Sequence, residues 1–163
     1  MIKGLHHNAY RCRDSEQTRR FYEDFLGLRL AGALEIKETK TGRRTDVLHT
    51  FYEMGNGSYL AFFEAPDRPF EFKDQHDYDL HIALEVDRAT LDRMYRKGKD
   101  EAREVRGVSD HGFIDSIYFR DPNGYVIELT CKREGHDEAM NPEKNGARTI
   151  VDRWTKDKQA KAA

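Results

Sequence analysis

Three residues of types that bind divalent metals, His7, His81 and Glu128, recur at equivalent places in the two halves of the sequence. The segment that starts at His7 aligns with the segment that starts at His81, and Ala61 aligns with Glu128. Two imidazoles and one carboxylate form a facial triad that suits Fe(II), with Mn(II) and Zn(II) as alternatives. Because Ala61 cannot ligate, an octahedral ion would keep roughly three open positions for a bidentate substrate and a small molecule such as O2.

Each of these residues also has a structural explanation. A strand histidine is often a hydrogen-bonded core residue, and Glu128 could be a buried carboxylate paired with an arginine. Three such residues at equivalent positions are harder to explain in this way. His6 competes with His7 for the metal, but strand alternation sends neighbours to opposite faces, and the alignment with His81 favours His7.

Arg11 lies four residues after His7, on the same face of the expected strand. It is therefore a candidate for the mouth of the cavity, where it would bind a substrate carboxylate. A surface salt bridge explains Arg11 equally well.

The elements that position these residues follow one pattern twice, a strand, a helix and three strands. In the first half, Phe21, Tyr22 and Phe25 form a helical face that ends at Gly27; in the second, we expect the helix to end at Gly98. The expected strands are 5–12, 29–36, 47–54 and 58–65, then 80–86, 102–105, 113–119 and 125–131, with a helix at 89–96. The fold class is α+β, with paired βαβββ modules that form a curved mixed sheet around a metal cleft.

Length and composition indicate one domain of a cytoplasmic protein. The 163 residues carry 28 basic and 30 acidic side chains, so a net charge of −2 gives no case for nucleic acid or an anionic membrane surface. No apolar run is long enough to span a membrane, no signal peptide is expected, and the two cysteines lack metal-finger spacing. We expect the domain at 1–135, with modules at about 4–66 and 79–132.

The segment 136–163 reads as a polar tail with a C-terminal helix. Ala147, Ile150, Val151 and Trp154 fall on one side of that helix. This stripe would pack against the domain or against a partner subunit.

Motifs at both ends of the repeat carry a family resemblance. The opening has His7, Arg13-Asp14, Phe21-Tyr22 and Leu26-Gly27, and the last hairpin runs from Tyr118 through Asp121-Pro122-Asn123-Gly124 to Glu128. Over about Leu5 to Lys132 the chain resembles the vicinal oxygen chelate superfamily of glyoxalases, bleomycin resistance proteins and extradiol dioxygenases.

Within the superfamily, the chain looks most like a one-domain type I extradiol ring-cleavage dioxygenase. The signature is His111, Ile117-Tyr118, Asp121-Pro122-x-Gly124 and Glu128. Ser109 departs from the residue types usual two places before the histidine. The presence of one such domain, where many of these enzymes carry two, puts the substrate pocket in doubt, and a partner subunit could complete it.

The resemblance implies an oxidoreductase of aromatic catabolism that uses Fe(II) and O2 to open a catechol-type ring. His111 would stand near the metal as an acid–base group, although a polar loop residue is the plainer explanation. Tyr118 would hydrogen-bond a substrate oxygen, and Phe113 would line an aromatic pocket; both are also ordinary packing residues. A homodimer is expected from family habit.

Rival functions remain open. Glyoxalase I usually has a fourth ligand where this chain has Ala61, and fosfomycin-type thiol transferases have threonine where it has Ala9. The thiol transferases would also not call for His111. Drug-binding bleomycin resistance proteins generally lack the metal ligands, and another isomerase of the fold is a further alternative.

Overall fold

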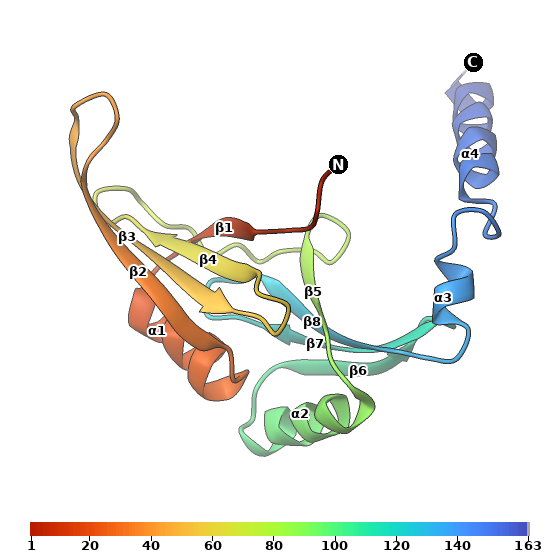
Figure 1. The fold of residues 1–163 in the computed structure, drawn as a ribbon, viewed down its shortest axis with the longest axis horizontal. Helices are drawn as coiled ribbons and strands as arrows, with labels where there is room; N and C mark the ends of the chain where they lie inside the picture. The colour runs from red at the N-terminus through yellow and green to blue at the C-terminus, as the bar shows by residue number, and fades with distance from the viewer. Residues whose placement is uncertain (163) are drawn as a thin grey trace.

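The chain folds as two βαβββ modules, and the computed structural model describes residues 1–162 (Figure 1). The first module contains β1 (His7–Cys12), α1 (Ser15–Arg19), the π-helical η1 (Arg20–Phe25), β2 (Arg29–Glu38), β3 (Arg44–Glu53) and β4 (Tyr59–Glu64). The second contains β5 (His81–Glu85), α2 (Arg88–Asp100), β6 (Val105–Asp110), β7 (Ile114–Arg120) and β8 (Val126–Lys132). The expected α+β class and module pattern are confirmed.

Each module forms its own four-stranded mixed sheet, with strand orders β1-β4-β3-β2 and β5-β8-β7-β6. The first strand of each module runs parallel to the last strand, and the other pairs are antiparallel. Ala9 pairs with Ala61 just as Ala83 pairs with Glu128. The equivalence read from the sequence is therefore also the equivalence of the strand registers.

Burial alternates along the strands because one face of each sheet packs against its helix. In the first module Tyr22 lies on Tyr52 and Phe62, with ring centroids 5.5 and 4.7 Å apart, and all three are fully buried. In the second module Leu91 and Met94 of α2 are buried. The opposite face of each sheet carries the candidate ligands.

The turn 121–124 joins the second module to the first. The Tyr22 hydroxyl donates to Asp121 Oδ2 at 3.0 Å, and the Arg13 amide donates to Asn123 Oδ1 at 2.9 Å. Asp121 and Asn123 are 2% and 1% exposed, so this turn is an internal polar contact rather than a surface loop. The Tyr125 hydroxyl adds a bond to the Arg11 carbonyl at 3.0 Å.

Two expectations about α2 and its neighbour are wrong. Helix α2 continues through Gly98 to Asp100, and the strand after it is Val105–Asp110 rather than 102–105. Gly98 is needed for close packing and not for a helix stop, since a Cβ there would lie 2.6 Å from the ring of Phe119. The first helix also widens into the π-helical η1, which the sequence did not indicate.

Beyond the second module lie a short helix, α3 (His136–Ala139), which was not expected, and the expected C-terminal helix, α4 (Ala147–Ala162). Figure 1 shows α4 standing apart from both modules. Ile150, Val151 and Trp154 are 52%, 57% and 66% exposed, so the apolar stripe does not pack on this chain.

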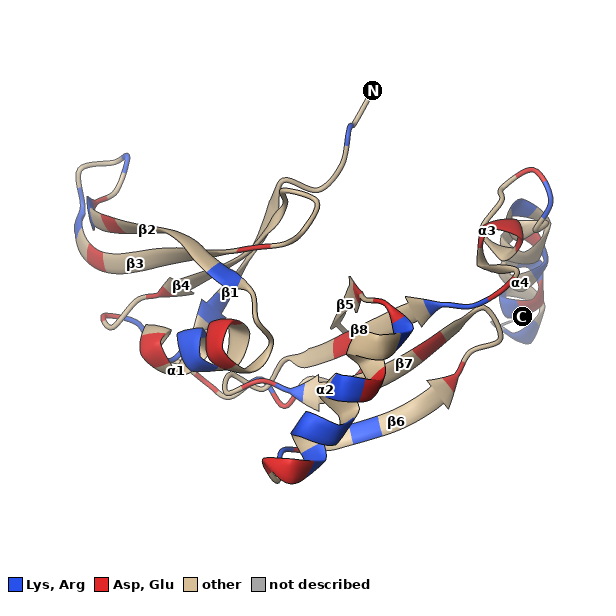
Figure 2. Cartoon of the chain, turned by 60° about the horizontal axis from the view of Figure 1, so that its bottom comes forward, with Lys and Arg blue, Asp and Glu red and all other residues tan. Residues whose placement is uncertain are grey.

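Charged residues of both signs occur in both modules (Figure 2). Figure 2 shows basic and acidic residues interspersed over the strands and helices of both modules. No helix among residues 1–162 is long and apolar enough to cross a membrane.

Candidate metal and catalytic site

His81 and Glu128 meet at one edge of the second sheet. His81 Nε2 lies 3.2 Å from Glu128 Oε2, and the Glu128 side chain is 5% exposed. His81 Nδ1 lies 2.7 Å from the carbonyl oxygen of Asp77, which can only accept. Nδ1 therefore carries a proton, which leaves Nε2 as the nitrogen that faces Glu128 and is placed to ligate a metal ion. A lone pair facing a carboxylate is repulsive unless a cation, a metal ion or a proton, lies between them.

The other oxygen of Glu128 accepts from two hydroxyls. Ser116 donates to Oε1, and Tyr118 donates to the same atom at 3.3 Å. His111 Nε2 lies 2.9 Å from the Tyr118 hydroxyl. His111, Tyr118 and Glu128 thus form a hydrogen-bonded chain, and Oε2 is left to face Nε2 of His81.

The environment keeps Tyr118 protonated. Burial, and then the nearby Glu128 carboxylate, raise the pKa of Tyr118 above its usual value. Tyr118 is therefore a hydrogen-bond donor at neutral pH, and the acceptor of its proton is Glu128 Oε1.

An ion pair supports this arrangement from the rim. The two terminal nitrogens of Arg106 each lie 2.9 Å from a carboxylate oxygen of Asp77, and they lower the pKa of that carboxyl. The Arg106 guanidinium also lies 5.1 Å from the Tyr118 ring centroid. Arg106 therefore positions both the segment that holds His81 and the ring of Tyr118. Sequence analysis missed Ser116, Asp77 and Arg106.

His7 lies on the other sheet and does not join His81 and Glu128. Its ring contacts His6, with the two Nδ1 atoms 2.8 Å apart, and lies 5.6 Å from the ring of Phe51. Within residues 1–162, no group of three His, Cys, Asp or Glu side chains is placed to hold a metal ion. The alternation argument against His6 also does not apply, since β1 begins only at His7 and the two imidazoles touch.

The other predicted site residues lie apart from this cluster. Arg11 is part-buried on β1 and bonds through one terminal nitrogen to the carbonyls of Ala65 and Arg68, both at 3.3 Å. Arg11 forms no salt bridge in the described part of the chain. Phe113 lies in the loop before β7, with its ring 6.0 Å from that of His136.

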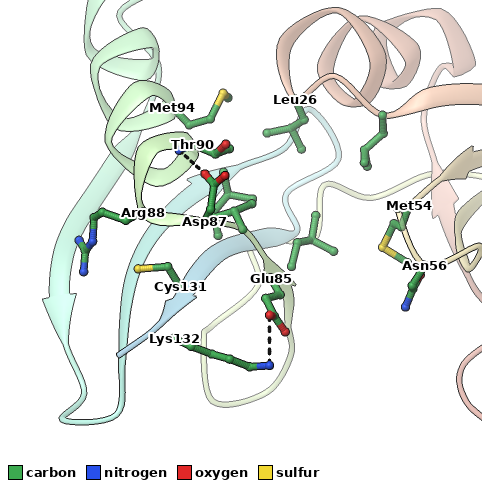
Figure 3. Close-up of a pocket in the computed structure, with 15 residues that line it drawn as sticks. Leu26, Met54, Asn56, Glu85, Asp87, Arg88, Thr90, Met94, Cys131 and Lys132 are labelled. Atoms are coloured by element: carbon green, nitrogen blue, oxygen red, sulfur yellow. Dashed lines mark hydrogen bonds and ion pairs between the residues drawn. The ribbon is translucent and has the colours of Figure 1, made fainter. Parts of the chain in front are cut away.

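A cavity of about 800 Å³ lies away from this cluster (Figure 3). Leu84, Leu129 and Cys131 line it from the helix-covered face of the second sheet, opposite to His81 and Glu128. Its charged groups already have partners, because Lys132 pairs with Glu85 at 3.1 Å and Asp87 caps α2. We therefore do not assign the reaction to this cavity.

The comparisons with known proteins agree on one family. The model described as "Glyoxalase/Bleomycin resistance protein/Dioxygenase superfamily" matches residues 4–129. The chain is 32% identical to a lactoylglutathione lyase of Neisseria meningitidis serogroup A, over 82% of this chain and 94% of the relative. It is 30% identical to an iron-dependent extradiol dioxygenase of Rhodococcus jostii, over 95% of this chain but 51% of that enzyme.

A solved structure supports the same fold. A mutant of the fosfomycin resistance protein FosX of Listeria monocytogenes, complexed with Mn(II), superposes with a TM-score of 0.62 at 20% identity. The match covers 85% of this chain and 99% of that one.

Proposed function

Because the chain belongs to the glyoxalase/bleomycin resistance protein/dioxygenase superfamily, we propose that it is a divalent-metal-dependent enzyme that opens a catechol-type ring with O2. The hydrogen-bonded chain from His111 through Tyr118 to Glu128 carries this proposal. It connects His111, an acid–base group that is not itself a ligand, to the candidate metal ligand Glu128 through the Tyr118 hydroxyl. The names of the Rhodococcus and Listeria proteins, with iron and Mn(II), support a divalent metal.

The metal would be held by His81, Glu128 and His7, with Fe(II) as the first choice and Mn(II) or Zn(II) as alternatives. When bound, the metal supplies a Lewis acid and, as iron, an electron donor for O2. The donor set fits, because Nε2 of His81 and Oε2 of Glu128 converge at 3.2 Å with their other atoms engaged elsewhere. Ala61 adds no fourth ligand, so positions stay open for substrate.

The third ligand, His7, would come from a second copy of the chain. The buried contacts of the turn 121–124 hold the two modules together with His7 outside the His81–Glu128 cluster. Strands β1 and β5, which start at His7 and His81, are both edge strands of their sheets. A twofold dimer can therefore set the first module of each copy beside the second module of the other.

The protein's own groups would then handle protons. Tyr118 has one proton, which it donates to Glu128 Oε1 in the free protein and would turn toward a substrate oxygen when substrate binds. His111 takes a proton from the diol and returns it during ring opening, through or beside the Tyr118 hydroxyl. The Arg106 guanidinium, which lies over the Tyr118 ring, keeps that ring in place.

A second candidate is a lactoylglutathione lyase-type reaction, favoured by the 32% identity to the Neisseria enzyme. Ala61 counts against it. Ala61 occupies the register position equivalent to Glu128 and has no ligating atom.

The test is anaerobic loading with Fe(II), followed by a panel of catechols with oxygen uptake and product absorbance recorded together. We expect O2 consumption equal to product, and His111→Ala to lower kcat by about 100-fold at unchanged iron content. His136→Ala is the matched control, since that histidine lies outside the cluster beside Phe113.

Full iron content without oxygen uptake on any catechol would reject the dioxygenase. Turnover of a glutathione hemithioacetal by the same preparation would then assign the lyase. Equal losses in His111→Ala and His136→Ala would remove His111 from the chemistry.

A further inference from the structure

The cavity of about 800 Å³ lies between the two modules, and its walls come from five separate segments (Figure 3). The first module contributes the segment before β2 and the β3–β4 turn, and the second contributes the ends of β5 and β8 and the first turns of α2. Small-molecule sites are concave pockets of roughly 300–1,000 Å³ and occur preferentially at interfaces between structural units. The candidate metal ligands His81 and Glu128 lie on the opposite face of the second sheet, so this cavity is separate from the proposed reaction.

Apolar side chains form most of the cavity wall, and they come from both modules. Five of them pack against the core but are only partly buried: Leu26, Leu28, Met54, Leu84 and Val86. Each therefore keeps apolar surface that a ligand in the cavity can cover. Removal of such surface from water is the main favourable term in association. The cavity thus suits a molecule with an apolar body.

The charged side chains at the cavity are already balanced. Lys132 pairs with Glu85 at 3.1 Å, Arg88 pairs with Asp115, and Asp87 caps the N-terminus of α2. An ionised ligand would leave water for an apolar cavity without a free counter-charge, which is unfavourable. The cavity therefore selects a neutral molecule over an anionic or cationic analogue.

We propose that this cavity is a second ligand site, which takes an uncharged molecule with an apolar body. Leu26, Leu28 and Met54 would contact the ligand from the first module, and Leu84 and Val86 from the second. Because it touches both modules, the ligand stabilises their arrangement in the folded chain. The binding requires no metal and does not depend on the proposed ring opening.

The two cysteines supply a reporter and its control. Cys131 and Cys12 are free thiols, 2% and 1% exposed, but only Cys131 lines the cavity. Burial raises the pKa of the Cys12 thiol to about 11, which keeps that thiol protonated and unreactive. A small neutral maleimide that enters the cavity should therefore alkylate Cys131 and spare Cys12.

The first test titrates the full chain with the neutral dye 6-propionyl-2-(dimethylamino)naphthalene and follows its emission. One dye per chain should bind with a blue shift, and the anionic dye 1-anilinonaphthalene-8-sulfonate should bind about 10-fold more weakly. Met54→Lys places a charge in the cavity wall and should weaken binding of the neutral dye about 10-fold. Leu34→Lys is the matched control, because Leu34 is an exposed residue of the same module that does not line the cavity.

The second test uses the unaltered protein and N-ethylmaleimide, with the labelled cysteine identified by peptide mass. Neutral dye at ten times its Kd leaves about one cavity in eleven empty, so it should slow alkylation of Cys131 about 10-fold. The same dye should raise the urea midpoint, because it binds the folded chain and bridges the modules.

Four results would overturn the site. Equal affinity for the two dyes would show that the charge balance does not select the ligand. Equal losses in Met54→Lys and Leu34→Lys would place the dye outside the cavity, as would unchanged alkylation of Cys131 with dye bound. Dye binding that weakens as the protein concentration rises would show that a second copy of the chain, and not a small molecule, fills the cavity.

Discussion

Two inactive variants should restore activity to each other if the metal site is shared between copies. His7→Ala removes the ligand from the first module, and Glu128→Ala removes the ligand that also accepts from Ser116 and Tyr118. Each variant alone has both sites broken. In a mixed dimer, His7 from the Glu128→Ala chain meets His81 and Glu128 of the His7→Ala chain, so one complete site forms.

The expected magnitude follows from counting sites. Equal co-expression with random pairing makes about half of the dimers mixed, and each of these has one intact site of two. The mixture should therefore reach about one quarter of unaltered activity, and mixed dimers isolated with two different tags about one half. Iron should bind at about one ion per mixed dimer, against two in the unaltered dimer.

The control pair is His81→Ala with Glu128→Ala. Both residues lie in the second module, on β5 and β8, so no pairing of these two chains rebuilds a site. This mixture should stay inactive. Tagged mixed dimers of His7→Ala with Glu128→Ala that bind no iron and consume no O2 would refute the shared site.

Three further predictions concern stability. Gly98→Ala should lower the free energy of unfolding in urea by about 1–3 kcal/mol, because the clash of the new Cβ with the Phe119 ring outweighs the gain in helix propensity. The control is Arg96→Ala, on the exposed side of α2, which should change the free energy of unfolding by under about 0.5 kcal/mol. Burial raises the pKa of Asp121, so the folded protein holds this proton more tightly than the unfolded chain does. The unaltered protein should therefore lose stability relative to Asp121→Asn as pH rises above 3.8, and a stability difference that does not vary with pH would contradict this. Removal of 147–163 should leave the urea midpoint unchanged, because the apolar side chains of α4 are exposed, and a fall would show that the proposed 1–135 domain is incomplete.

The repeated βαβββ pattern could be predicted from the sequence because side chains alternate along a strand with a strict two-residue period. Once His7 aligns with His81, the two-residue alternation places Ala61 and Glu128 on the ligand-bearing faces, and the registers confirm that placement. The helix face of the first module was similarly visible from its spacing.

Other features depend on what lies across space rather than along the chain. Ser116 reaches Glu128 only through the β7–β8 register, and the pairing of Arg106 with Asp77 joins segments 29 residues apart. Gly98 was misread because one residue type serves both helix termination and close packing. The separation of His7 from its partners depends on how the modules pack, which no local pattern encodes.

The two modules have equivalent strand orders, but the side chains on their ligand-bearing faces differ in chemical type. Glu128 and its cross-strand neighbour Tyr118 are ionisable, whereas the equivalent pair in the first module, Ala61 and Phe51, is apolar. An apolar face suits recognition of an aromatic ring, and a face of hydroxyls and a carboxylate suits proton transfer. A shared site would place one face of each kind on every substrate, so loss of the Phe51 ring from the first face should raise KM, whereas loss of the Tyr118 hydroxyl from the second should lower kcat.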